Sequence, residues 1–328
     1  MKKLLWILCS TLLVVACSED EERSNIAGIV LSDTDITLVN GERYTLSAEV
    51  STLDGTECKV AWASSDGSVV TVDENGNLTA GQTGQAQIYA MAEDQQAVCQ
   101  VTVTSPQPAQ VGDYYFSDGT YAAELNPKKQ CICIVFQVDQ HANDRSDYSQ
   151  TGIGARSCHG YVVALQDAGT DECMWGVYGY EIGLYPVDES GNKIDNFTNN
   201  GADTDWSGFL YTGKITLEAE RNGGFTPDSQ EGYPVGYYTR LFEQQVPAPA
   251  NSSGWFIPAV SQLYAIYELR DQLNAREGMT RLRNKWYWSS SECYALADGS
   301  VNSLSVSAGM IGYRGKFDTA LLRPILAF

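Results

Sequence analysis

Short stretches in which apolar and polar residues alternate follow one another through residues 26–104. A period of two residues is typical of a β-strand with one buried face. Dipeptides that favour tight turns, such as Asn40-Gly41 and Asn75-Gly76, separate these stretches. The pattern predicts a small all-β sandwich, with seven strands at residues 29–31, 36–38, 44–48, 60–62, 69–72, 86–90 and 98–103.

The pattern changes in residues 111–328, where longer apolar runs and a helical period appear. Apolar residues recur every three or four positions at 258–278, between Pro258 near the start and Gly278 at the end, so a helix is predicted there. A shorter helix is predicted at 233–245. The second part is therefore expected to be α+β, with few helices and a mostly antiparallel sheet formed by a hairpin at 111–125 and strands at 131–138, 159–168, 286–292, 301–311 and 321–328.

Residues 105–110 separate these two predicted domains. The segment has prolines at 106 and 108. Two prolines within three positions favour an extended, semi-rigid connector. The predicted organisation is therefore a sandwich at 26–104, a linker at 105–110 and a second domain at 111–328.

The first residues have the pattern of an export signal. Lys2 and Lys3 precede a short apolar run, residues 4–15, which cannot span a bilayer. The run ends in "VVAC", similar to a bacterial lipobox, so residues 1–16 are predicted to be a lipoprotein signal peptide and Cys17 the lipidated first residue. The acidic tether at 17–25 is similar to the surface-export signal of Bacteroidetes-type lipoproteins. We expect a lipid anchor in the outer membrane and a protein that faces the cell exterior; the alternatives are a plain secretory signal and a periplasm-facing anchor.

Charge and tyrosine content narrow the range of partners. The chain has 21 Lys and Arg against 41 Asp and Glu, a net charge of -20. Nucleic-acid binding needs a basic stripe to contact phosphates, so nucleic acid is not an expected partner. The 19 tyrosines are compatible with a binding surface, because the tyrosine ring offers rigid contact area at low entropic cost.

The nine cysteines leave an odd number for pairing. Loss of Cys9 with the signal and lipidation of Cys17 leave seven, so at least one is not in a disulfide. Export permits disulfides, and Cys58 and Cys99, in the same predicted domain, are the expected pair. The sequence leaves the connectivity of the others open: Cys131, Cys133, Cys158, Cys173 and Cys293.

The first domain resembles a known family. Its central motif "WASSDGSVVTVDENGNLTA" starts at Trp62, "LSDTDITLVNGERYTLSAEV" precedes it, and "CQVTVT" closes the segment. These pieces resemble the bacterial Ig-like domain of group 2 over residues 26–104. The resemblance implies a spacer or adhesion module, with Trp62 packed between the two sheets.

The second domain resembles the Lcl C-terminal/FISUMP group. The motifs are "VGDYYFSDGTY", "NSSGWFIPAVSQLYAIY", "WYWSSSE" and "LLRPILAF", which follow in order over nearly all of 111–328. The resemblance implies a C-type-lectin-like fold. It makes "WYWSSSE" a strand followed by a turn, with both tryptophans buried and with Glu292 and the serines stabilising the turn. Alternation along the strand places Trp286 and Trp288 on one face and Tyr287 on the other.

Enzymatic chemistry finds little support in the residues. The chain has two histidines, His141 and His159, and no Gly-x-Ser-x-Gly motif, so hydrolytic catalysis by a serine and a base is not expected. We expect no enzyme activity and no cofactor.

Metal binding is also not expected. A thiolate site would use Cys131, Cys133, Cys158 and His159, and a strand is expected to place the first two sulfurs on one face. The Cys-Ile-Cys spacing is closer than in typical zinc sites, which favours buried thiols or a disulfide. Calcium motifs of C-type lectins are absent, and the aspartates that could replace them are interpreted as solvated loop residues: Asp144, Asp147, Asp203 and Asp205.

Ligand binding is the function that remains. In "NSLSVSA", alternation places Leu304 and Val306 inward and the serines outward. We expect a surface lipoprotein whose Ig-like stalk presents a C-type-lectin-like domain to an unknown protein or glycan, with a diversified receptor as one version; the alternatives are a structural or fimbria-associated subunit and, less favoured, a hydrolase. The predicted contact residues are Tyr294, Asp298, Asn302, Ser303, Ser305, Ser307 and Tyr313.

Overall fold

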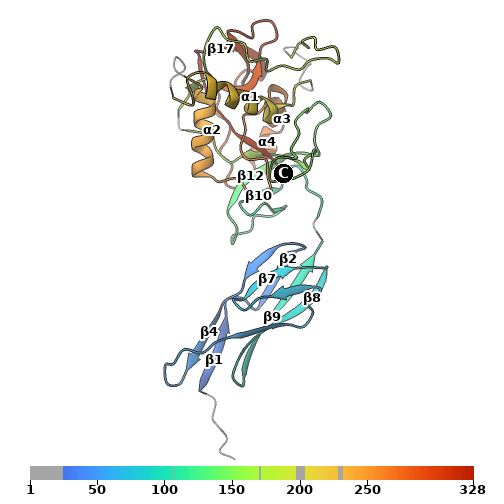
Figure 1. The fold of residues 1–328 in the computed structure, drawn as a ribbon, viewed down its shortest axis with the longest axis vertical. Coiled ribbons are helices and arrows are strands. Elements are labelled where there is room, and N and C mark those ends of the chain that lie inside the picture. Colours follow the sequence, from blue (N-terminus) through green and yellow to red (C-terminus); the bar gives the residue numbers. More distant parts are fainter. Residues whose placement is uncertain (1–24, 106, 170, 197–203, 228–231) are drawn as a thin grey trace, which may run out of the picture. The chain divides into compact units, whose positions relative to one another are not determined.

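A computed structural model describes residues 25–105, 107–169, 171–196, 204–227 and 232–328. The chain forms two compact units, of which unit 1 ends at Gln107 and unit 2 begins at Pro108 (Figure 1). The predicted signal peptide and Cys17 lie outside the described residues. Within the described ranges, no helix combines the length and the hydrophobicity needed to cross a bilayer.

Unit 1 is all β. Its strands form a four-stranded sheet in the order β2-β9-β8-β5, a three-stranded sheet in the order β3-β7-β6, and the pair β1-β4. Only β2 and β9 pair in parallel among the described strands. The strands are β1 (Ile26–Leu31), β2 (Asp35–Val39), β3 (Arg43–Thr45), β4 (Ala48–Thr52), β5 (Ala61–Ser64), β6 (Val70–Val72), β7 (Asn77–Ala80), β8 (Gly84–Ala92) and β9 (Gln95–Thr104).

One-sided burial explains why alternation predicted this unit. In β9, Cys99, Val101 and Val103 are buried, and every second residue of β8 is buried opposite them. All seven predicted strands coincide with strands of the structure, while β4 and β7 add to them. Trp62 is only half-buried, since it lies on the edge strand β5 and packs against the rim of the core.

The predicted disulfide between Cys58 and Cys99 is wrong. Cys99 lies in mid-β9 opposite Ile88, which in turn pairs with Ser64 of β5. Cys58 precedes β5, which β8 separates from β9 in the sheet, whereas a disulfide needs Cα atoms within about 7 Å. Both residues are thiols, and each sulfur lies 3.6 Å from the carbonyl oxygen of the next residue, Lys59 and Gln100 respectively.

Unit 2 contains two main sheets. The five-stranded sheet has the order β11-β10-β12-β13-β19, and the three-stranded sheet has the order β15-β16-β17; a short pair, β14-β18, lies beside β15. The strands are β10 (Tyr114–Phe116), β11 (Tyr121–Ala122), β12 (Cys131–Val138), β13 (Gly160–Ala164), β14 (Cys173–Met174), β15 (Trp286–Glu292), β16 (Ser300–Ser305), β17 (Met310–Gly315), β18 (Thr319–Ala320) and β19 (Ile325–Ala327).

Helices cover part of the three-stranded sheet. The helix α1 (Gly208–Arg221) packs against β15, and α3 (Val260–Glu268) packs against β15 and β16. The predicted helix at 233–245 is confirmed as α2 (Pro234–Gln245). The predicted helix at 258–278 is two helices, because Leu269 leaves the helical conformation (ψ 3°) before α4 (Arg270–Asn274). The chain is thus predominantly β with few helices.

A β-bulge changes the predicted placement of the cysteines on β12. Tyr115 pairs with Cys133 and Phe116 pairs with Cys131, so the register shifts by one residue between them. Cys133 therefore belongs to one core cluster, and Cys131 packs against the other, together with Cys158. The two sulfurs do not share a face, and no described group of three His, Cys, Asp or Glu residues could hold a metal ion.

Candidate functional site

The stretch "WYWSSSE" forms β15 and is buried almost throughout. As predicted, Trp286 and Trp288 pack on one core cluster, and Tyr287 belongs to the other. The Trp288 indole N–H donates to the Cys173 carbonyl at 2.7 Å. The Ser291 hydroxyl accepts from the first N–H of α3, on Val260, at 2.9 Å. The stretch therefore has a structural role: it connects neighbouring elements inside unit 2.

The neighbouring strand β16 corrects part of the predicted contact set. Asn302 and Ser303 are fully buried and Ser305 is 3% exposed, so these three side chains do not face solvent. The reason is that β16 is the middle strand between β15 and β17 and also packs against α3. Alternation indicates which residues share a face, but it does not indicate whether the second face is open.

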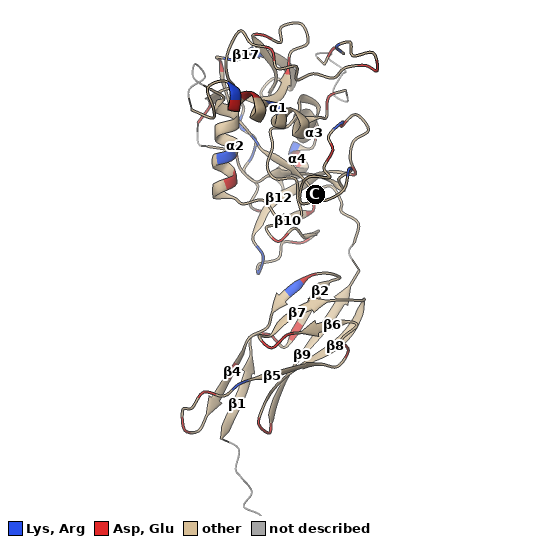
Figure 2. Ribbon diagram, in the orientation of Figure 1, with Lys and Arg blue, Asp and Glu red and all other residues tan. Residues whose placement is uncertain are grey.

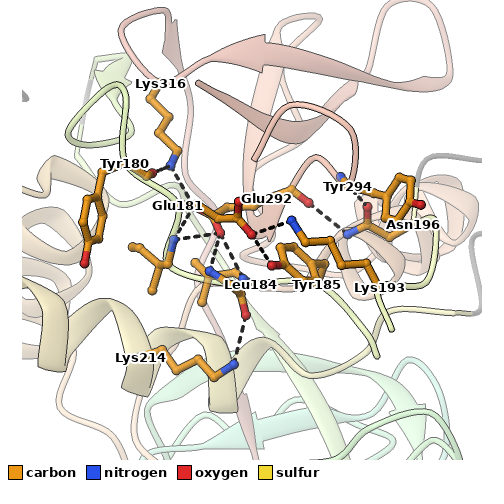
Figure 3. Close-up of polar contacts among 12 residues, drawn as sticks. Tyr180, Glu181, Leu184, Tyr185, Lys193, Asn196, Lys214, Glu292, Tyr294 and Lys316 are labelled. Carbon is orange, nitrogen blue, oxygen red and sulfur yellow. Dashed lines mark hydrogen bonds and ion pairs between the residues drawn. The ribbon is translucent and has the colours of Figure 1, made fainter. Parts of the chain in front are cut away.

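Glu292, at the end of β15, holds a distant loop. Its side chain is fully buried and accepts from three successive backbone N–H groups: Ile182 at 3.0 Å, Gly183 at 2.8 Å and Leu184 at 3.0 Å (Figure 3). Gly183 has a φ of +84°, a conformation that glycine adopts without strain. Such a run of converging N–H groups is a typical anion-binding concavity.

Lys316 completes this site. Its ammonium group lies 2.7 Å from a Glu292 carboxylate oxygen, and neither side chain is exposed. The same ammonium donates to the Tyr180 carbonyl and lies 5.1 Å from the centroid of the Trp175 ring. Burial lowers the pKa of Lys316, and the Glu292 charge opposes this decrease. Removal of either partner would leave a buried charge uncompensated.

Asn196 joins a third segment to the loop. Its amide donates to the Glu292 carbonyl at 3.0 Å and to the Asp205 carboxylate at 2.9 Å, and its side-chain oxygen accepts from the Tyr294 N–H at 3.3 Å. Lys214 of α1 donates to the Gly183 carbonyl at 2.9 Å. Buried polar contacts thus fix the loops 175–196, 293–299 and 315–318 against the three-stranded sheet.

These loops expose large apolar side chains. In the view of Figure 3, the rings of Tyr180 and Tyr294 flank the buried Glu292 carboxylate. The Tyr178 and Phe317 rings lie 5.2 Å apart. We call this group the loop surface, with the exposed fraction of each residue as follows: Tyr178 56%, Tyr180 43%, Tyr294 38%, Leu296 44% and Phe317 50%.

Four of the predicted contact residues are exposed, and the structure brings only some of them together. Tyr294 belongs to the loop surface, and Asp298 lies on the same loop, 293–299. Tyr313 is exposed in mid-β17. Ser307 lies in the turn after Ser305, at the far end of the β16–β17 hairpin from Ser300, about 17 Å away at 3.3 Å per residue. Sequence reasoning missed Tyr178, Tyr180 and Phe317, although "WGVYGYEIGLY" is rich in aromatic residues.

Asp205 is a buried acid next to this network. Burial raises its pKa to about 6, and hydrogen bonds from Asn196, Ser291 and Tyr211 oppose this increase. One of its carboxylate oxygens is buried without a hydrogen-bond partner among the described residues. The prediction that Asp205 is a solvated loop residue is therefore wrong, and so is that for Asp144, which accepts from the Tyr148 and Tyr161 hydroxyls. Asp147 is exposed, and Asp203 lies outside the described residues.

We expect Asp205→Asn to raise the free energy of unfolding at pH 7. The folded-state pKa of about 6 exceeds the ordinary value of 3.8, so the charged form costs on the order of 3 kcal/mol in the folded state. This cost is fully present above pH 6, decreases as the pH falls, and disappears below the ordinary value of 3.8, where both states are protonated. Urea unfolding of both proteins at several pH values measures the difference. A variant less stable than the parent by the same amount at every pH would contradict the prediction.

Comparison with known proteins identifies unit 1. Residues 26–103 match the family of bacterial Ig-like domains of group 2. A fimbrial protein from Bacteroides ovatus ATCC 8483 aligns with 93% of this chain and 71% of its own, at 15% identity and a TM-score of 0.49. Domains 4 and 5 of the S-layer protein SbsC align with 24% of this chain and 52% of theirs, at 15% identity and a TM-score of 0.22. A mutant intimin from EHEC O157:H7 aligns with 28% of this chain and 55% of its own, at 18% identity and a TM-score of 0.21.

These findings define the class of unit 1 and leave unit 2 open. Unit 1 is a bacterial Ig-like domain of group 2, as predicted, and this class favours a cell-surface protein. No curated protein sequence matches the chain. The C-type-lectin-like, FISUMP-type identity of unit 2 stays a prediction.

Proposed function

We propose that the protein is a non-catalytic binding or adhesion protein of the cell surface. A lipid on Cys17 would anchor it to the outer membrane, facing the exterior, and the Ig-like unit 1 would serve as a stalk. Unit 2, with a C-type-lectin-like fold of the FISUMP type, would bind a protein or a glycan.

The loop surface is the observation that supports this proposal best. The loops that carry these exposed side chains are already ordered by the Glu292–Lys316 ion pair and by the N–H groups of residues 182–184. Little further conformational entropy is therefore lost when the side chains contact a ligand. Aromatic residues that are fixed before binding contribute most to affinity at protein interfaces, since little conformational entropy is lost. A pre-ordered aromatic surface is therefore suited to binding.

The first test combines a binding screen with three single variants. The soluble chain from Ser18 onward is screened against arrays of glycans and of extracellular proteins. For any ligand found, Tyr178→Ala, Tyr294→Ala and Phe317→Ala are expected to weaken binding by roughly 5- to 30-fold each, since truncation of a central aromatic contact costs about 1–2 kcal/mol.

Leu217→Ala is the matched control, because Leu217 is an exposed apolar residue (54%) that belongs to α1 and not to the loops 175–196, 293–299 and 315–318. It should leave affinity unchanged. If the three aromatic variants bind as tightly as the parent, the loop surface is not the ligand site. Absence of any ligand on both arrays would favour the alternative of a structural or fimbria-associated subunit.

A further inference from the structure

One face of α2 lines a hollow in unit 2 and carries no charge. The helix has two charged side chains, Arg240 and Glu243, and neither of them lines the hollow (Figure 2). The residues that line it are Tyr238, Leu241 and Gln245, whose spacings of three and four positions place them on one helix face. The hollow has a volume of about 610 Å³, within the range of about 300–1,000 Å³ for small-molecule sites.

The charges of the opposite wall balance one another. Asp167 lies between two guanidinium groups, 2.7 Å from Nε of the buried Arg323 and 3.1 Å from an Nη atom of Arg283. Asp171 adds a second carboxylate to the wall. Two negative charges therefore stand against two positive ones. Because the hollow has no net charge, an ion of either sign gains little Coulombic attraction there, and a neutral ligand is favoured.

Four uncharged polar side chains in the hollow are available to a ligand. Gln166, Gln245 and Thr280 are exposed, and Tyr238 is half-buried. None of these four side chains forms a hydrogen bond with another residue in the described part of the chain. A carboxamide or a hydroxyl group can both donate and accept. Such groups match a ligand whose own polar groups also do both, which is the property of a sugar hydroxyl.

The α2 side of the hollow also offers an apolar contact. The Tyr238 ring is held edge-to-face against Tyr237, with 5.2 Å between the ring centroids. Gly169 lies against the same ring, since a Cβ atom at this glycine would be 3.3 Å from it. Leu241 is half-buried one helical turn further along. A ring that is fixed in this way gives contact area to a ligand at low entropic cost.

We propose that this hollow binds a neutral saccharide. A sugar ring has an apolar face of C–H groups that can pack on Tyr238 and Leu241, and hydroxyls at its edge that can pair with Gln166, Gln245 and Thr280. An acidic or basic peptide segment would bring a charge that the hollow does not balance. The site shares no residue with the loop surface and goes beyond the proposed function.

The test uses the soluble chain from Ser18 onward in surface plasmon resonance with three neutral polysaccharides: dextran, mannan and galactan. Binding to at least one of them is expected, and its affinity should change less than about twofold between about 0.05 and 0.5 M salt, because no net charge is paired. Tyr238→Ala should weaken this binding roughly 5- to 30-fold, since the aromatic contact is lost. Gln245→Ala should weaken it about 3- to 10-fold, the effect of one lost neutral hydrogen bond.

Gln244→Ala is the matched control, because Gln244 is an exposed glutamine of the same helix that does not line the hollow. Unchanged affinity is expected for this variant and for Tyr178→Ala on the loop surface. Equal loss with Gln244→Ala and Gln245→Ala would overturn the proposal, as would a steep fall of affinity with salt or no binding to any of the three polysaccharides. Loss with Tyr178→Ala and not with Gln245→Ala would also overturn it, because saccharide binding would then lie on the loop surface. Gln245 is exposed, so its variant tests the hollow even if Tyr238→Ala disturbs folding.

Discussion

Lys316→Met should lower the free energy of unfolding of unit 2 by about 3–5 kcal/mol, the range found when one partner of a buried ion pair is removed. The Glu292 carboxylate would keep its three backbone N–H donors but lose its counter-ion, and neither side chain is exposed to water. The Tyr180 carbonyl would also lose the ammonium donor. Thermal and urea unfolding of the full chain measure the change.

The double variant Glu292→Gln, Lys316→Met separates charge from packing. Glutamine keeps an acceptor for the N–H groups of residues 182–184 and carries no charge, so the double variant should be more stable than Lys316→Met alone. Arg156→Ala serves as the control, because it removes the exposed ion pair between Arg156 and Asp147. Loss of an exposed pair should lower the free energy of unfolding by less than about 1 kcal/mol. If the double variant were no more stable than Lys316→Met, the unpaired charge of Glu292 would not be the cause of the lost unfolding free energy.

Loss of the Glu292–Lys316 ion pair should also make the loops that carry the loop surface less ordered. Glu292 and Lys316 contact the backbone from Tyr180 to Leu184, in the loop that carries the exposed Tyr178 and Tyr180 rings. Faster hydrogen exchange at 180–184 in Lys316→Met, with unit 1 unchanged, would link the buried pair to the order of the proposed ligand site. Such local opening is typical of loops that lose buried contacts.

The fold of unit 1 was predictable from alternation because its longest strands, β8 and β9, bury one face. Buried residues alternate with more exposed ones in β8 from Gln85 to Ala92 and in β9 from Val98 to Thr104. In unit 2 the same rule failed at β16. There, the polar side chains of Asn302, Ser303 and Ser305 are buried between neighbouring elements. No local pattern shows that a second layer covers a strand.

The candidate site was hidden for a different reason. Glu292 was interpreted as a residue that stabilises a turn, since only its neighbours in the chain were known. Its N–H donors lie 108 to 110 positions away and Lys316 lies 24 positions away. Pairings at such separation follow from the tertiary fold alone. The exposed rings of Tyr178 and Phe317, brought within 5.2 Å by that fold, were missed likewise.

Asp167→Ala should destabilise unit 2 by about 3–5 kcal/mol as well, because it leaves a second buried charge without its partner. Arg323 is fully buried, and its Nε lies 2.7 Å from Asp167. Its remaining N–H groups donate to the Ala164 and Thr280 carbonyls at 3.1–3.2 Å, which cannot balance the charge. Urea unfolding of the full chain, compared with Asp167→Asn, measures the effect. The asparagine keeps one acceptor and should be less destabilising.

Arg283→Ala tests whether the buried Arg323 accounts for the destabilisation expected of Asp167→Ala. It removes the exposed guanidinium from Asp167 and leaves the Arg323 contact intact, so it should cost less than about 1 kcal/mol. If Arg283→Ala proved as costly as Asp167→Ala, the exposed pair would be the stabilising one. The loss of unfolding free energy should be largest for Asp167→Ala, smaller for Asp167→Asn and smallest for Arg283→Ala. This order follows from burial, because water can replace a contact at Arg283 but has no access to Arg323.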